Sequence, residues 1–211
     1  SIDFVFGMLK RIKKMNLPQE YFSFPGPLIR KIIQFFDDKA MSNILKFAAI
    51  SKIVKKRKEY FPSREDVEVI YHPSNLEEFT NRSYDYFLTV NRMDGPKRVK
   101  MVVEAYLKSD TDIPLKVVGS GPMENEIKEM AKNDPRVEFL GNVKDSELIE
   151  LYSKTFTVIY VPYQEDMGLV TIEAMKSGKA VITCLDSGGV LEFVKDGVNG
   201  IITKPNINDL Q

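Results

Sequence analysis

The sequence of 211 residues has little of the two side chains that most often serve redox and metal chemistry, since it holds one cysteine and one histidine. The single thiol, Cys184, permits no internal disulfide, and its place in the apolar run 180–185 favours a buried structural role. The single histidine, His72, excludes catalytic schemes that need two histidines and any multi-histidine zinc site. We expect His72 to line a turn or a crevice.

Long hydrophobic runs and common nucleotide-binding motifs are also missing. No run approaches the roughly 20 apolar residues of a membrane-spanning helix. The loop 119–122 (GSGP) is not a dinucleotide fingerprint, because Glu124 stands where that motif needs its third glycine. No glycine-lysine-Ser/Thr run of a P-loop occurs. A dehydrogenase and a P-loop kinase are therefore disfavoured.

The charges that are present fall into two groups. The chain holds 30 basic and 30 acidic residues, but residues 1–64 hold 14 Lys/Arg against 5 Asp/Glu. A basic front and an acidic remainder predict two units in different surroundings. We place the first over 1–66 and the second over 67–211.

The first unit shows helical spacing of apolar residues at 5–15 and 28–36, and an apolar strand pattern within 43–51. Ser51 is the expected cap of a following helix at 52–60. The basic segment of that helix, from Lys52 to Lys58, fits either a patch for anionic lipid or a solvated helix face.

From residue 67 the pattern becomes a regular alternation of strands and helices. A short strand at 67–71 and a polar linker at 75–84 come first. Further strands are predicted at 86–90, 115–118, 137–140, 157–161, 181–185 and 201–203, with helices at 99–107, 123–131, 146–152, 169–176 and 190–194. Ser146 is the expected cap of the helix at 146–152. This order predicts the α/β class with a doubly wound parallel sheet.

The stretch 164–178 (QEDMGLVTIEAMKSG) places two carboxylates around a helix start. Glu165 lies in the loop after a buried strand, at the edge where ligands of open α/β sheets bind. Glu173 follows about one turn into the helix and is close enough to face the same crevice. Between them, the N–H groups of Gly168 and Leu169 begin the helix and suit an anion such as phosphate. We expect the active site here.

Three other loops end at the same sheet edge. The loop 91–98 carries Arg92 and Lys97, two cations that can clamp a diphosphate opposite the helix start, although solvated loops are often basic too. Gly121 lets a ligand approach the backbone closely.

The third loop begins at Gly141, and the backbone of Gly141, Asn142 and Val143 can cover a nucleobase. A sugar nucleotide matches this set of amides, cations and carboxylates.

These stretches resemble, in order and spacing, the C-terminal half of the family 4 retaining glycosyltransferases. The motifs that carry the resemblance are VNRMDGPKRV, VVGSGP, VEFLGNV, EDMGLVTIEAMKSGKAVI and GGVLEFVKDGVNGII. The resemblance covers roughly 67–205, and the Glu-x7-Glu element with its flanks is its specific part. It implies the GT-B fold, in which the C-terminal one of two Rossmann-like domains holds the donor.

The resemblance also implies roles for the residues of the site. Arg92 and Lys97 would neutralise the donor diphosphate as it departs. Glu165 would contact the sugar hydroxyls, and Glu173 the nucleotide ribose. Asn91 departs from the family, which usually has glycine there, and this bears on how closely the diphosphate approaches.

Backbone groups complete the implied site. Gly168 and Leu169 would give N–H groups to sugar and phosphate, Thr171 would add its hydroxyl, and residues 141–143 would hold the base. No metal ion and no cofactor would be required, because the cations and the helix dipole neutralise the charge.

By the same resemblance, residues 1–66 are expected to be a partial acceptor domain and residues 67–211 a donor domain truncated at its C-terminus. Mannosyltransferases of polysaccharide or glycoprotein-glycan assembly are the most similar members. The expected function is retaining transfer of a sugar from GDP-mannose or a UDP-sugar to a glycan or lipid-linked acceptor. The expected place is the cytoplasm, including the inner face of the membrane, with no nucleic-acid partner.

Two other interpretations stay open. A non-catalytic nucleotide-sugar-binding or regulatory module of the same fold would bind donor without needing Glu165 for transfer. An interaction scaffold built on the basic helix would bind liposomes and no nucleotide.

Overall fold

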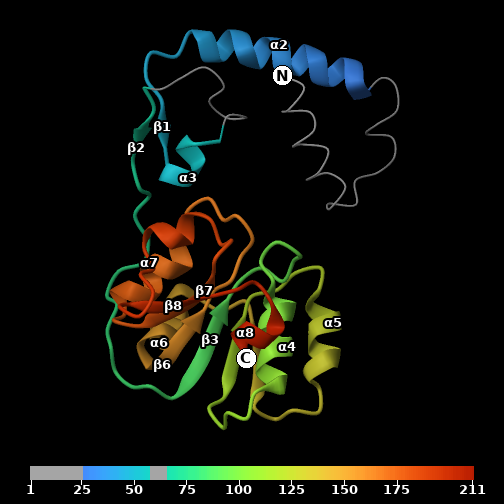
Figure 1. The fold of residues 1–211 in the computed structure, drawn as a ribbon, viewed down its shortest axis with the longest axis vertical. Helices are drawn as coiled ribbons and strands as arrows, with labels where there is room; N and C mark the ends of the chain where they lie inside the picture. Colours follow the sequence, from blue (N-terminus) through green and yellow to red (C-terminus); the bar gives the residue numbers. More distant parts are fainter. Residues whose placement is uncertain (1–25, 58–65) are drawn as a thin grey trace. The chain divides into compact units, whose positions relative to one another are not determined.

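The computed structural model describes residues 26–57 and 66–211. Its contacts divide the chain into two compact units, one with residues 1–49 and 55–69 and the other with residues 50–54 and 70–211 (Figure 1). The helix predicted at 5–15 lies outside the described residues.

The first unit contains one long helix and two short strands within its described part. Helix α2 (Gly26–Ser42) includes the helix predicted at 28–36 and is longer. Strands β1 (Ala48–Ala49) and β2 (Glu68–Val69) pair in parallel, each within a longer predicted strand. Ala49 is buried in this unit.

The second unit is built on a six-stranded parallel sheet in the order β5-β4-β3-β6-β7-β8. Its strands are β3 (Tyr86–Val90), β4 (Leu115–Val118), β5 (Val137–Gly141), β6 (Thr155–Ile159), β7 (Ala180–Cys184) and β8 (Gly200–Thr203). The prediction of a doubly wound parallel sheet is confirmed. Strand β6 begins earlier than predicted, because Thr155 pairs with Tyr86 of the neighbouring β3.

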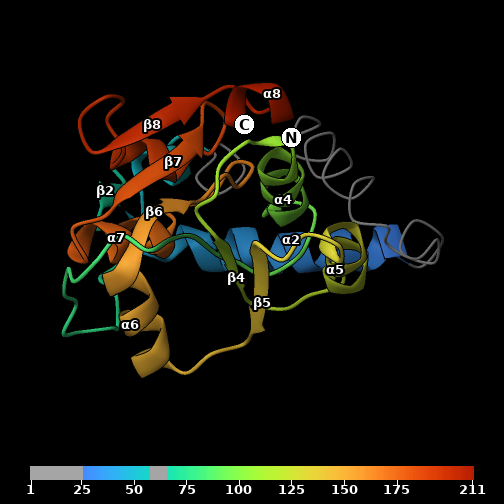
Figure 2. The ribbon, with the colours of Figure 1, turned by 90° about the horizontal axis from the view of Figure 1, so that it is seen from below.

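Helices cover both faces of the sheet, as the view from below shows (Figure 2). They are α4 (Val99–Lys108), α5 (Glu124–Ala131), α6 (Asp145–Lys154), α7 (Leu169–Lys176) and α8 (Ile207–Leu210), with a 3₁₀ turn η2 (Gly189–Glu192). One apolar cluster joins the sheet to α4 and α5, through residues such as Val103 and Ile127. A second joins the opposite face to α6 and α7, through Tyr152 and Ala174.

Two local predictions fail near helix starts. Ser146 does not cap α6, since that helix begins at Asp145 after Lys144 and Ser146 lies in its first turn. The helix predicted at 190–194 is the 3₁₀ turn η2. Ser51 is a cap as predicted, because its hydroxyl accepts the N–H of Val54 at 3.1 Å.

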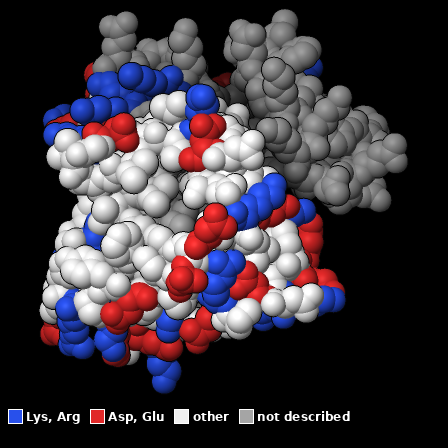
Figure 3. All heavy atoms as spheres, turned by 60° about the horizontal axis from the view of Figure 1, so that its bottom comes forward, with Lys and Arg blue, Asp and Glu red and all other residues white. Residues whose placement is uncertain are grey.

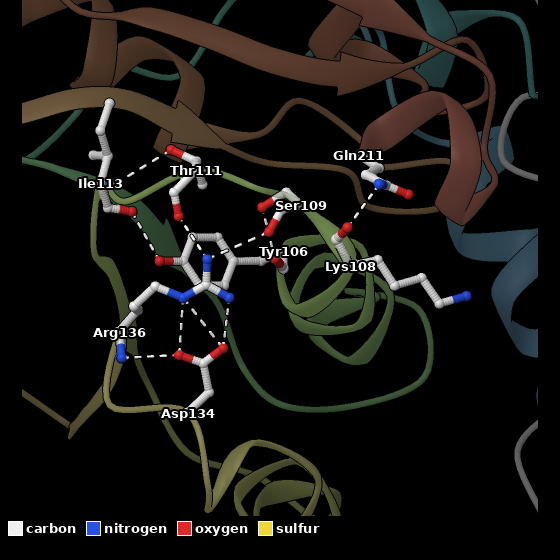
Figure 4. A network of polar contacts seen from close by, with 8 residues as sticks. All are labelled: Tyr106, Lys108, Ser109, Thr111, Ile113, Asp134, Arg136 and Gln211. Atoms are coloured by element: carbon white, nitrogen blue, oxygen red, sulfur yellow. Dashed lines mark hydrogen bonds and ion pairs between the residues drawn. The ribbon is translucent and has the colours of Figure 1, made fainter.

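Arg136 joins segments at the amino-terminal ends of the strands, opposite the predicted site (Figure 4). Its guanidinium donates to the carbonyls of Ser109 and Thr111, pairs with Asp134 at 2.6 Å, and lies 5.1 Å from the ring centroid of Tyr106. These contacts tie the end of α4 to the segments that enter β4 and β5. Arg136 therefore has a structural role away from the chemistry.

Charged side chains on the surface are largely intermingled. In the lower half of the face drawn in Figure 3, acidic and basic groups alternate. Several form pairs within one helix, such as Glu124 with Lys128 and Glu150 with Lys154. Exposed pairs of this kind contribute little to stability.

Three buried tyrosines make the folded state sensitive to alkaline pH. Burial raises the pKa of Tyr86 to about 12, and burial with nearby carboxylates raises the pKa of Tyr152 and Tyr160. In the unfolded chain these hydroxyls ionise at about pH 10. Above that pH the unfolded state therefore holds fewer protons than the folded state, and the free energy of unfolding falls. We expect urea titrations to show a free energy of unfolding that declines from about pH 10 upward, less steeply in Tyr86→Phe. A free energy that rises over that range would contradict this.

Candidate functional site

The candidate site lies at the carboxyl ends of the strands, where the strand order reverses. Strands β3 and β6 are neighbours at the centre of the sheet, although α4, α5 and α6 separate them in the chain. The helices that follow them, α4 and α7, pack on opposite faces of the sheet. Open α/β sheets bind ligands at such a switch point.

A lysine and a glutamate meet across this switch point. The Nζ atom of Lys97, from the loop after β3, lies 2.5 Å from Oε2 of Glu165, from the loop after β6. The two side chains are 28% and 21% exposed, so both remain accessible to a ligand. The sequence predicted that Arg92 and Lys97 both face Glu165, and the structure brings Lys97 to it.

Backbone hydrogen bonds hold the loops around this pair. The N–H of Tyr163 donates to the carbonyl of Pro96 at 2.8 Å, which joins the loop after β6 to the loop after β3. The N–H of Gln164 donates to the carbonyl of Asp186 at 2.9 Å, and that of Glu165 to Ser187 at 3.2 Å. Glu165 is thus fixed between two neighbouring loops before any ligand binds.

A second ion pair reinforces the same loops. Arg98 donates to both carboxylate oxygens of Asp186, at 2.8 and 2.6 Å, and lies 5.0 Å from the ring centroid of Tyr163. These bonds raise the pKa of the Arg98 guanidinium. Arg98 also precedes α4 with a left-handed backbone at φ 56°, a conformation that costs a non-glycine residue energy. The bidentate pair offsets this cost and fixes the residue next to Lys97.

Helix α7 begins beside Glu165. Gly168 precedes it with φ 85°, and the first N–H groups of a helix have no partner within the helix. An added Cβ at Gly168 would lie 2.8 Å from Val190 and 2.9 Å from Tyr160. Only glycine fits there, which lets the backbone turn into α7 beside Glu165.

Replacing Gly168 with alanine is expected to lower the free energy of unfolding by about 1–3 kcal/mol, because alanine would be strained at this φ and would collide with two buried side chains. Chemical denaturation measures the difference. The matched control is Gly95→Ala, whose Cβ would meet nothing within 4 Å and should change the free energy by less than about 0.5 kcal/mol. Equal values for the two variants would refute the steric argument.

The second carboxylate of the Glu-x7-Glu element is held from two sides. Oε2 of Glu173 accepts the hydroxyl of Tyr152 at 2.9 Å, and Oε1 lies 3.4 Å from the hydroxyl of Ser74. Thr171, on the same helix, is fully buried, and the described protein atoms give its hydroxyl no hydrogen-bond partner.

The other predicted residues have neighbours other than Lys97 and Glu165 among the described contacts. Arg92 is 70% exposed and its Nε lies 3.4 Å from Asp94 of its own loop. Gly121 packs so closely that a Cβ would lie 2.5 Å from the carbonyl oxygen of Met93. Its loop is joined to the next one, since the hydroxyl of Ser120 donates to the side chain of Asn142 at 3.1 Å.

At the end of β5, Gly141 has a positive φ of 64° and open space where a Cβ would be. Val143, two residues on, packs against the apolar cluster of α6 and α7. Asn142, between them, is exposed. Leu169, in the first turn of α7, is half-buried.

Sequence reasoning missed the residues that hold the carboxylates and the loops. The sequence assigned no functional role to Tyr152, Tyr160 or Asp186. Arg98 carried no signal of a left-handed backbone. Only Asp186 offered a hint, since a carboxylate in a loop at this edge faces the cations of the loop 91–98.

Residues 50–54 and the segment from residue 70 onward belong to the second unit by their contacts. The hydroxyl of Ser51 donates to the carbonyl of Asp166, next to Glu165. The carboxylate of Glu192 accepts the N–H groups of Lys52 and Ile53, at 3.0 and 2.9 Å, and the hydroxyl of Tyr71 at 2.9 Å. Both connecting segments are thus fastened to the second unit. The hydrogen bond to Glu192 raises the pKa of the Tyr71 hydroxyl.

The basic segment predicted as a helix at 52–60 is described only to residue 57, and it forms the short helix α3 (Lys52–Lys55). Its contact with a membrane stays a prediction. Among the described residues, no helix combines the length and apolar character needed to cross a bilayer.

Comparison with known proteins assigns this chain to a family. The family model described as glycosyl transferases group 1 matches residues 75–211, which is more than half of the chain. The matched residues include Lys97 and Glu165 and all six strands of the sheet in the second unit.

Individual relatives agree with this match. An uncharacterized glycosyltransferase of Methanocaldococcus jannaschii is 29% identical over 182 residues, covering 84% of this chain and 51% of that protein. The alpha-1,3/1,6-mannosyltransferase ALG2 of Dictyostelium discoideum is 30% identical over 147 residues, covering 59% of this chain and 35% of that protein. The chain spans about half the length, or less, of the curated relatives it matches.

Solved structures share the fold. The Anabaena protein HepE, in complex with UDP and glucose, matches with a TM-score of 0.66 and 21% identity over 78% of this chain and 51% of that one. Staphylococcus aureus TarM, in a complex that includes UDP, matches with a TM-score of 0.69 and 21% identity over 80% of this chain and 36% of that one.

Proposed function

The chain belongs to the glycosyl transferases group 1, and on that premise we propose that it binds a nucleotide-diphosphate sugar at the switch point and serves retaining transfer of the sugar. The observation that carries this proposal is the contact between Lys97 and Glu165 near the N-terminus of α7. A cation for phosphate and a carboxylate for sugar hydroxyls lie side by side there, next to a helix start that attracts anions.

The diphosphate is the part of the donor that gains charge during the reaction. The bond between the anomeric carbon and the diphosphate oxygen breaks, and its electron pair goes to that oxygen. Lys97 and Arg92 stabilise this charge together with the N–H groups of Gly168 and Leu169. The acceptor hydroxyl forms the new bond on the same face of the sugar and gives its proton to the departing phosphate. No metal ion and no cofactor is needed in this scheme.

The sugar and the nucleoside occupy the two sides of the diphosphate. Glu165 binds hydroxyls of the transferred sugar, and Glu173 binds the ribose. The backbone of residues 141–143 holds the base. Thr171 contributes its hydroxyl from within the first turn of α7, where the described protein atoms leave that hydroxyl without a partner.

The donor is GDP-mannose or a UDP-sugar. Similarity to an alpha-1,3/1,6-mannosyltransferase supports the first, and a shared fold with proteins solved in complex with UDP supports the second. The acceptor is a glycan or a lipid-linked glycan. The alternative is a non-catalytic module of the same fold, which binds the same donor and transfers nothing.

Incubation of the intact protein with UDP-glucose, UDP-GlcNAc and GDP-mannose tests the proposal. We expect one donor to be consumed, with release of its nucleoside diphosphate and a product of the same anomeric configuration as the donor, detected by NMR. Binding of a donor without its consumption would favour the non-catalytic module. A product of inverted configuration would contradict the retaining mechanism.

A further inference from the structure

Two buried tyrosines lie against the two carboxylates of the Glu-x7-Glu element. Tyr152, in the last turn of α6, is 0% exposed and its hydroxyl donates to Oε2 of Glu173 at 2.9 Å. Tyr160, directly after β6, is 2% exposed, and burial together with the nearby carboxylate of Glu165 raises the pKa of its hydroxyl. Each motif carboxylate thus has a buried tyrosine close to it, and for Glu173 the hydroxyl donates directly.

Tyr160 lies at the centre of this cluster. A Cβ built on Gly168 would be 2.9 Å from its ring and 3.5 Å from Cγ of Glu165, so ring, glutamate and helix start are in close contact. Nζ of Lys97 lies 5.9 Å from its ring centroid. Contacts therefore run from Lys97 through Glu165 to the ring of Tyr160 and the start of α7.

We propose that Tyr160 and Tyr152 are positioning residues that orient Glu165 toward the sugar and Glu173 toward the ribose. This inference rests on the proposed function, since it assigns each tyrosine to the subsite of its carboxylate. It predicts two separable effects, one on the sugar and one on the nucleoside.

The physical reason is the freedom of a glutamate side chain. A half-buried carboxylate on three rotatable bonds has several orientations, and each must be given up when a ligand binds. A hydroxyl donor held in a packed ring selects one orientation in advance. Burial raises the pKa of both tyrosines, so both hydroxyls keep their protons and stay donors at neutral pH.

The test removes one hydroxyl at a time and leaves the rings in place. Calorimetric titration with a nucleotide sugar, its nucleoside diphosphate and its nucleoside measures each subsite. For Tyr160→Phe we expect affinity for the nucleotide sugar to fall about tenfold, with nucleoside diphosphate affinity within about twofold of wild type. For Tyr152→Phe we expect nucleoside affinity itself to fall about tenfold.

The matched control is Tyr86→Phe. Tyr86 is also buried, and its hydroxyl donates to a backbone carbonyl, that of Leu151, at 3.0 Å. This variant should lose thermal stability as the others do and keep all three affinities. A purely structural role of Tyr160 and Tyr152 would give their variants the same pattern as this control, which would overturn the inference.

A double variant shows whether Tyr160 acts through its glutamate. If it does, Tyr160→Phe combined with Glu165→Gln binds the nucleotide sugar no more weakly than Glu165→Gln alone. Additive losses would overturn the inference and leave the proposed function standing. Wild-type protein that binds no nucleotide sugar would refute the proposed function itself, whatever the variants do.

Discussion

Replacing Lys97 with alanine is expected to weaken the binding of a nucleoside diphosphate about 100-fold and to leave nucleoside binding within about twofold of wild type. Lys97 supplies the cation that lies at the switch point, and its removal also leaves the carboxylate of Glu165 without its partner at 2.5 Å. That unpaired negative charge would then repel the diphosphate. Calorimetric titration with UDP, GDP and ADP, each against its nucleoside, measures both effects.

Lys100→Ala is the matched control for this prediction. Lys100 is the second residue of α4, and its ammonium group pairs with Glu126 of α5, on the surface of the same domain. Its loss changes the net charge by the same amount, so any general electrostatic effect appears in both variants. An equal loss of nucleoside and nucleoside diphosphate affinity in Lys97→Ala would remove Lys97 from the diphosphate subsite.

Replacing Glu165 with glutamine is expected to lower the rate of sugar transfer by the intact protein about 10²- to 10³-fold, with the affinity for nucleoside diphosphate little changed. Glutamine has almost the same shape and its side-chain oxygen still accepts from Lys97, so the loop keeps its backbone bonds to Asp186 and Ser187. What is lost is the negative charge beside the anomeric centre, where positive charge develops. Initial rates at saturating donor measure the change.

Glu138→Gln controls for the removal of a carboxylate. Glu138 lies on β5, is 55% exposed and pairs with Lys116. This variant should transfer sugar as wild type does. Unchanged transfer in Glu165→Gln would show that the carboxylate has no part in the reaction and would favour the non-catalytic module.

The sheet could be predicted well because its strands are short, apolar and separated by clear turn residues. Strands β3 and β4 match their predicted bounds. Strand β6 does not, since 155–161 is apolar or β-branched at almost every position and no local feature marks where pairing stops. Its register is set by pairing with Tyr86 on one side and Ala180 on the other, which a single segment does not reveal.

The site could be predicted in part, because the rule that ligands bind at the carboxyl ends of parallel strands needs only the order of elements. That rule correctly brought Lys97 and Glu165 to one place. It did not separate Lys97, which reaches the glutamate, from Arg92, whose described ion pair is with Asp94 in its own loop. The two cations are five residues apart in one loop, so the order of elements alone does not distinguish them.

The contacts between the tyrosines and the glutamates were beyond sequence reasoning for a different reason. Tyr152 reaches Glu173 because α6 and α7 pack on the same face of the sheet, a tertiary arrangement that no local pattern contains. Arg98 was missed because its left-handed backbone is stabilised by Asp186, which lies 88 positions away. Residues of this kind follow from packing between elements, so a structure is needed to find them.

The most direct test of the central claim is calorimetric titration of this chain with UDP, GDP and ADP, each compared with its own nucleoside. The account predicts that one diphosphate binds at least about tenfold more tightly than its nucleoside, and that Lys97→Ala removes the difference. A wild-type chain that binds diphosphate and nucleoside equally would contradict the assignment of the switch point as a diphosphate site.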